Sequence, residues 1–136
     1  MRKRILFAAA LGASATAFIA AVPAEAQRYY FRNWQTIGFT SVDPGVDRDT
    51  IRVRGDARFR AVRLCVFNAP LVMRDFDIRF ANGGRQDVRV RQRMAAGTCT
   101  RVVDLRGRAR DIRSVRLTYS PIRRGWTRPL VRVQAR

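Results

Sequence analysis

The stretch LVMRDFDIRFANGGRQDVRVRQRM, residues 71–94, decides the fold class. In its first half Phe76, Ile78 and Phe80 alternate with charged residues, and in its second half valines alternate with arginines. A period of two places successive side chains on opposite faces of a β-strand. Asn82-Gly83-Gly84 separates the halves, and these residues tolerate the positive φ angles of tight hairpins. The stretch therefore predicts a hairpin of strands Leu71–Phe80 and Gln86–Met94.

The same alternation recurs on both sides of this hairpin. Turn residues such as Asp43-Pro44-Gly45 and Gly55-Asp56 separate the segments at a spacing of roughly 8–12 residues, which is typical of β-sandwiches. The other expected strands are Trp34–Val42, Thr50–Arg54, Phe59–Phe67, Thr98–Leu105, Ile112–Tyr119 and Leu130–Val133. Phe59–Phe67 is nearly continuous in apolar residues and is expected to lie centrally. The prediction is an all-β chain with a single antiparallel β-sandwich of about eight short strands, and a barrel is the alternative.

The segment before the strands predicts export. A basic start at Arg2-Lys3-Arg4, an apolar stretch from Ile5 to Val22 and the motif Ala24-Glu25-Ala26 follow one another as in a cleaved secretory signal peptide. The alternative is an uncleaved membrane anchor, but the stretch is rich in small residues that partition weakly into lipid. We expect a signal peptide at 1–26, an N-terminal lead-in at 27–33 and a β-sandwich domain at 34–136. The mature chain is then periplasmic or secreted and has no expected transmembrane segment.

A spaced pattern of apolar and turn residues covers most of residues 34–120. It consists of Trp34, Ile37-Gly38, Val42, Asp47, Asp49, Ile51-Arg52-Val53, Phe59, Val62-Arg63-Leu64-Cys65-Val66, Asp77-Ile78-Arg79-Phe80, Asn82-Gly83, Gly97, Asp104-Leu105 and Arg110–Val115 through to Tyr119. This pattern resembles that of an uncharacterised family of small exported β-proteins from enterobacteria. The resemblance implies a β-sandwich and brings no catalytic residues.

Arginine dominates the charge of the chain. The sequence holds 28 basic and 10 acidic residues and no histidine; without the three basic residues and Glu25 of the expected leader, 25 arginines stand against nine aspartates, a net charge of +16. A cationic excess of this size repels itself and attracts polyanions.

Eight of these arginines recur at every second position of a strand or crowd a predicted loop. They are Arg89, Arg91 and Arg93 on one strand face, Arg106, Arg108 and Arg110 in one loop, and Arg123 and Arg124 in another. If arginine-bearing strands pair, one sheet face becomes a continuous guanidinium field. Guanidinium groups bind phosphate and carboxylate in bidentate fashion, so these residues are the candidate anion-binding site.

The expected partners are anionic envelope polymers (lipopolysaccharide, phospholipid head groups, acidic polysaccharide) or an acidic protein. The alternative is a structural or protein-interaction module with incidental basic charge, in which each cation lies near an aspartate. Nucleic acid is not expected as a partner, because the chain is expected to be exported and lacks a recognition motif. Trp34 and Trp126 are expected in the core or at the edge of the sandwich.

Cys65 and Cys99 are expected to form a disulfide, because an even cysteine count in a small exported domain is typical of one. A thiol nucleophile and a metal pair are the alternatives, and both are weakened by the absence of histidine.

The residue inventory favours a protein that is not an enzyme and needs no cofactor or metal. A Ser-His-Asp triad is excluded because there is no histidine. Asp75 and Asp77 share a strand face and could form a carboxylate pair, but the surrounding arginines favour ion pairing. Asp43, Asp47 and Asp49 are expected to form a turn; calcium binding and ion pairing with Arg48 or Arg52 are the alternatives.

Overall fold

The computed structural model describes Gly12 and residues 33–136. The expected signal peptide (1–26) and the lead-in up to residue 32 lie outside the described residues. The described residues form ten strands and no helix. The strands are β1 (Gln35–Ser41), β2 (Arg48–Arg52), β3 (Arg58–Phe59), β4 (Ala61–Phe67), β5 (Leu71–Phe80), β6 (Arg85–Met94), β7 (Thr98–Cys99), β8 (Val103–Asp104), β9 (Arg110–Tyr119) and β10 (Leu130–Ala135).

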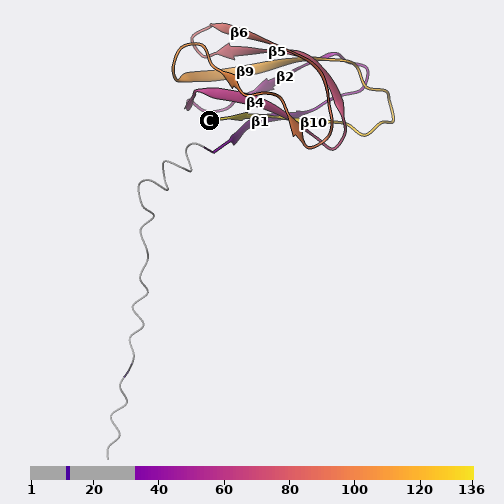
Figure 1. Cartoon of the computed structure of the whole chain (residues 1–136), viewed down its shortest axis with the longest axis horizontal. Helices are drawn as coiled ribbons and strands as arrows, with labels where there is room; N and C mark the ends of the chain where they lie inside the picture. The colour runs from indigo at the N-terminus through magenta and orange to yellow at the C-terminus, as the bar shows by residue number, and fades with distance from the viewer. Residues whose placement is uncertain (1–11, 13–32) are drawn as a thin grey trace, which may run out of the picture.

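These strands make two antiparallel five-stranded sheets that pack face to face (Figure 1). The first sheet has the order β1-β10-β4-β7, with β8 also beside β4, and the second has the order β2-β9-β5-β6, with β3 beside β9. Alternate residues of both sheets point inward, and those of β4 and β10 include the buried Val62, Leu64 and Val133. The all-β class and the antiparallel β-sandwich are confirmed.

The hairpin that the sequence predicts is formed by β5 and β6, and Phe76 and Ile78 are buried on its inner face. Its pairing is not regular throughout. Between the pairs Asp75–Arg89 and Met73–Gln92, β6 carries two residues and β5 carries one, which is a β-bulge. Arg91 lies in this bulge with a φ of 46°. The regular row of three arginines expected on β6 is therefore interrupted at its middle member.

Two of the expected strands are divided. The segment Phe59–Phe67 begins as β3 beside β9 and continues as β4 beside β10, so the chain passes between the sheets at Arg60. Its β4 part lies between β10 and the short strands β7 and β8, which confirms the expected central position.

The segment Thr98–Leu105 is divided into β7 and β8 around Thr100. The backbone N–H of Leu64 donates to Thr100 Oγ1 (3.0 Å) and the N–H of Thr100 donates to the Leu64 carbonyl (2.7 Å). The threonine hydroxyl thus replaces a backbone acceptor, and the regular ladder stops there.

Side chains tie the two sheets together at both lateral edges. At the β1–β2 edge the two sheets approach closely: a Cβ on Gly38 would lie 2.6 Å from Ile51 Cγ2 and 3.1 Å from the Arg52 carbonyl oxygen. Thr40 Oγ1 donates to Asp49 Oδ2 across the same edge at 3.1 Å. At the β6 edge the buried Gln86 side chain donates to the Asp104 carbonyl (3.0 Å) and accepts from the backbone N–H of Arg106 (2.8 Å). The Gln86 contacts hold the backbone of residues 104–106 against β6.

The expected disulfide is confirmed. Cys65 and Cys99 are direct cross-strand partners on β4 and β7, their Cα atoms are 4.0 Å apart, and they are separated by 34 residues in sequence. The bond holds the two-residue strand β7 on the first sheet. A disulfide of this kind is compatible with export.

We predict that replacing both cysteines, Cys65→Ser with Cys99→Ser, lowers the free energy of unfolding by up to about 4 kcal/mol, because the unfolded chain loses a closed loop of about 35 residues. Urea unfolding followed by circular dichroism measures this change. Wild type treated with reductant is the control and should unfold at the same urea concentration as the double variant. An unchanged midpoint in both samples would contradict the prediction.

Candidate anion-binding surfaces

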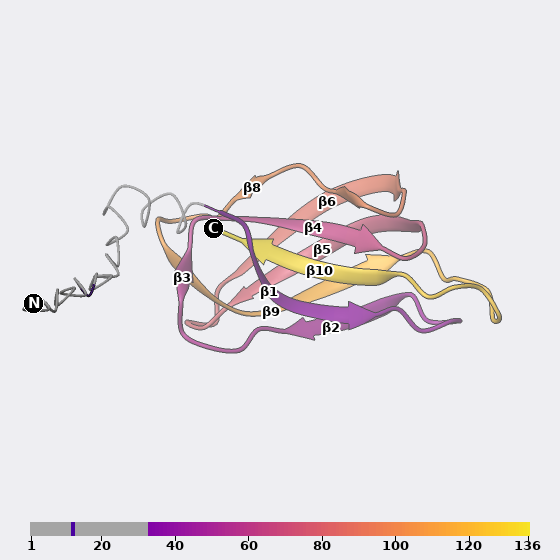
Figure 2. The same cartoon turned by 90° about the horizontal axis from the view of Figure 1, so that it is seen from below.

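The sandwich presents loops at two ends, and the predicted arginines are distributed between them. One end, here called the C-terminal end, carries the chain terminus, the β5–β6 turn and the β8–β9 loop. The opposite end carries the β1–β2 loop, the β4–β5 loop and the long β9–β10 loop, which projects from the sandwich (Figure 2). Arg106, Arg108 and Arg110 belong to the C-terminal end, Arg93, Arg123 and Arg124 to the opposite end, and Arg89 and Arg91 to β6 between them. The structure therefore does not bring the eight candidates into one site.

The outer face of the second sheet is not the continuous guanidinium field that strand pairing would allow. The arginine-bearing strands β2 and β6 lie at opposite edges of this sheet. Between these edges the outward positions include Asp75 and Asp77 of β5, and Asp87 of β6 lies directly across from Asp77. The centre of this face is consequently a mixed cluster of carboxylates and guanidinium groups.

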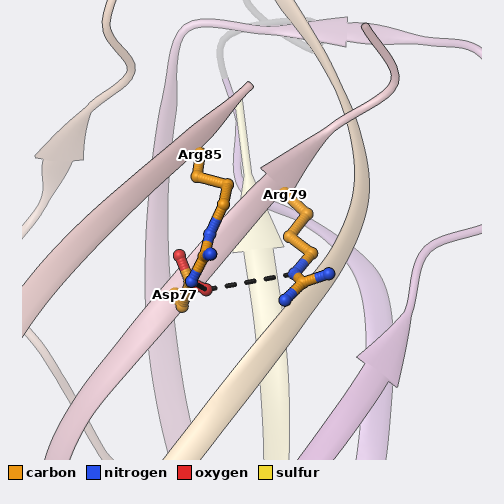
Figure 3. Close-up of polar contacts among 3 residues, drawn as sticks. All are labelled: Asp77, Arg79 and Arg85. Carbon is orange, nitrogen blue, oxygen red and sulfur yellow. Dashed lines mark hydrogen bonds and ion pairs between the residues drawn. The ribbon is translucent and has the colours of Figure 1, made fainter. Parts of the chain in front are cut away.

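Asp77 is the most enclosed carboxylate of this cluster, with only 8% of its surface exposed. Arg85 Nη2 lies 2.8 Å from Asp77 Oδ2, and Arg79 Nε lies 4.0 Å from the same oxygen (Figure 3). A hydrogen bond shared with Asp77, together with the charge of that carboxylate, raises the pKa of Asp87 above its ordinary value. The expected ion pairing is thus present at Asp77. The negative charges of Asp77 and Asp87, which lie opposite each other on neighbouring strands, repel one another.

We predict that Asp87→Asn is at least as stable as wild type at pH 7. A carboxyl group with a raised pKa binds its proton more tightly in the folded state, so wild type loses stability as the pH rises from the ordinary value of 3.8 through the raised one. The asparagine variant has no such proton to lose. Thermal unfolding midpoints between pH 3 and pH 7 measure the difference, with Asp104→Asn on the other sheet as a control of equal charge. A variant that loses stability relative to wild type across this range would refute the assignment.

At the C-terminal end, one of the eight predicted arginines, Arg110, is held by contacts within the protein. The guanidinium of Arg110 lies 3.8 Å from the centroid of the Phe80 ring. Its Nη atoms donate to the Arg106 carbonyl (2.6 Å) and to Asn82 Oδ1 (3.2 Å). Arg110 therefore joins the β5–β6 turn to the β8–β9 loop, whereas Arg108 lines a separate cavity of about 400 Å³.

A second cavity at this end is polar. It has a volume of about 640 Å³, and the two aspartates Asp56 and Asp111 line it together with Arg58 and Arg110. Cations and anions thus share this cavity.

The opposite end contains a cavity of about 640 Å³, here called the end groove. One wall is the β4–β5 loop with the start of β5, and the other wall is formed by residues 120–127. Arg93 and Arg123 of the predicted set line it, beside Trp126, which is 61% exposed. The residues that line this groove include no aspartate. The exposure of Trp126 shows that this residue lies outside the core. The loop between β9 and β10 carries it past the end of both sheets.

The last predicted residue, Arg124, lines a neighbouring cavity of about 380 Å³ with Asp43 and Arg128. Arg128 Nη1 lies 2.8 Å from Asp43 Oδ1.

Asp49 accepts hydrogen bonds from Thr40 and from the backbone N–H of Thr50. Within residues 33–136 no group of three or more metal-ligating side chains is present.

Sequence reasoning missed a layer of stacked arginines on the outer face of the first sheet. The guanidinium groups of Arg63 and Arg136 lie 4.3 Å and 4.7 Å from the Trp34 ring centroid. Arg132 lies 4.7 Å from the Phe67 ring centroid in the same way. Part of the signal was present in the sequence, because Arg63 and Phe67 of β4 and Arg132 of β10 alternate with inward apolar residues. Stacking covers one face of each guanidinium.

The fold and these surfaces define an arginine-rich, disulfide-bonded β-sandwich protein. The chain belongs to the family described as "Domain of unknown function (DUF2541)", whose model matches residues 6–135. No curated protein matches the sequence significantly.

Among solved structures, the chain is similar to AlgX of Pseudomonas aeruginosa, with a TM-score of 0.46 and 15% sequence identity. The match covers 73% of this chain and 26% of AlgX, so the chain spans about a quarter of that protein. In the described part of the chain, no helix is long and apolar enough to cross a membrane.

Proposed function

We propose that this protein is a non-enzymatic exported β-sandwich that binds anionic polymers of the cell envelope through its arginines. The polymers in question carry phosphate or carboxylate groups, as lipopolysaccharide, phospholipid head groups and acidic polysaccharides do. A bidentate guanidinium contact suits both groups.

One observation carries the proposal: most guanidinium groups have no carboxylate partner. Of the 23 arginines between residues 33 and 136, only Arg79, Arg85 and Arg128 lie within 4.0 Å of a carboxylate oxygen. A module with incidental charge would place each arginine near an aspartate, and this count speaks against that alternative. A surplus of unpaired cations favours association with polyanions.

The residue inventory supports the non-enzymatic part of the proposal. The chain has no histidine, so proton transfer near neutral pH would fall to aspartates. Asp77 and Asp87 are direct cross-strand partners, but they lie on a sheet face where Arg85 already holds Asp77. The confirmed disulfide is in keeping with a periplasmic or secreted protein.

We predict that the protein is retained on heparin and elutes only at a salt concentration well above the physiological value of about 0.15 M. The control is a sulfopropyl resin of equal charge density, which measures net charge without a polymer chain. Later elution from heparin than from the sulfopropyl resin supports an arranged polymer-binding surface. Flow-through at low salt, or elution from heparin no later than from the control resin, would remove the proposal.

A further inference from the structure

The end groove is a preformed site, because hydrogen bonds hold both of its walls. The backbone N–H of Ser120 donates to the Val72 carbonyl (2.9 Å), which joins the two walls at their base. The N–H of Gly45 donates to the Ile122 carbonyl (3.1 Å) and anchors the long loop from its other side.

The tip of the long loop is a tight turn. The Trp126 N–H donates to the Arg123 carbonyl (3.3 Å), and Gly125 between them has a φ of 82°. A glycine with positive φ at the third position of a four-residue turn is characteristic of type II. The guanidinium of Arg123 lies 5.5 Å from the centroid of the indole ring of Trp126. The backbone of the groove is therefore in position before a ligand binds, which lowers the cost of binding.

The lining combines an apolar floor with free cations. Pro70, Val72 and Ile122 supply apolar surface, and Val72 is 40% exposed. Trp126 adds a large aromatic face that is 61% exposed. Exposed aromatic and apolar surface at one place is typical of a ligand-binding groove. The volume of about 640 Å³ suits a short stretch of a polymer.

The charge of the groove selects the chemistry of the ligand. In the described structure neither Arg93 nor Arg123 lies within 4.0 Å of a carboxylate, and no aspartate lines the groove. Carboxylates on the ligand would give Arg93 and Arg123 the anionic partners that they lack. Their carrier must also offer a flat apolar face to Trp126, and the C–H face of a sugar ring has this property.

We propose that the end groove binds a short segment of uronic-acid polysaccharide, with one sugar ring stacked on Trp126 and its carboxylates on Arg93 and Arg123. This inference rests on the proposed function and names its ligand class. A membrane surface fits less well, because the exposed Asp47 on the β1–β2 loop lies at the same end and would repel lipid phosphates. A groove between two loops also suits a chain better than a plane.

The test is calorimetric titration of the full chain with a galacturonic acid hexasaccharide. We expect Trp126→Ala to weaken binding about tenfold, and Trp126→Phe to retain most of the affinity because a flat ring remains. We expect Arg93→Gln to weaken binding about tenfold, and Arg108→Gln at the C-terminal end, with the same change in net charge, to have little effect. Inorganic polyphosphate, which has charge but no ring, should bind wild type and Trp126→Ala alike. Because Trp126 is exposed, its replacement should leave the unfolding temperature unchanged.

The outcomes separate this inference from the proposed function. If Trp126→Ala and Arg93→Gln bind the hexasaccharide as Arg108→Gln does, while heparin still retains all variants, the groove assignment is wrong and polymer binding stands. If heparin does not retain wild type but the hexasaccharide binds in a Trp126-dependent way, the groove assignment is supported and the proposed binding of polymers through the wider arginine surface is wrong. Binding to anionic phospholipid vesicles that depends on Trp126, with no binding of the hexasaccharide, would overturn the groove assignment in favour of a membrane.

Discussion

The structure depends on accommodating many more guanidinium groups than carboxylates, 25 against nine outside the expected leader. Salt bridges account for few of them. Instead, Arg63, Arg132 and Arg136 stack on aromatic rings of the first sheet, and Arg110 stacks on Phe80. Stacking and hydrogen bonds to backbone carbonyls restrain a guanidinium without neutralising it. The surface therefore keeps its positive charge, and a buried apolar core with one disulfide supplies the cohesion that opposes the repulsion.

The fold was largely predictable because its signal is local. Alternation with a period of two located both strands of the β5–β6 hairpin, and Asn82-Gly83-Gly84 located its turn. The disulfide followed from the cysteine count and the expected compartment. The crossing between sheets at Arg60 and the break at Thr100 were not predictable, because each depends on a partner distant in sequence. The same holds for the β6 bulge at Arg91, which alternation alone cannot reveal.

The sequence shows which arginines are candidates for anion binding, but it does not show where the fold places them. The prediction that alternate arginines form one surface ignored the order of the strands, because β2 and β6 lie at opposite edges of the sheet with Asp75 and Asp77 of β5 between them. The β8–β9 and β9–β10 loops belong to opposite ends, and no local pattern shows that. The useful signal was Arg123-Arg124-Gly125-Trp126 within a loop bounded by Pro121 and Pro129, since a glycine turn that presents an aromatic residue beside arginines belongs at a surface.

The most direct measurement of the central claim is the thermal unfolding midpoint of the protein as sodium chloride is raised from very low ionic strength. Uncompensated guanidinium groups repel one another, and added salt screens that repulsion. Our account predicts that the midpoint rises with salt before it levels off. A midpoint that falls as salt is added would mean that attractive ion pairs hold the fold together, and would contradict the claim that its cations are free for polyanions.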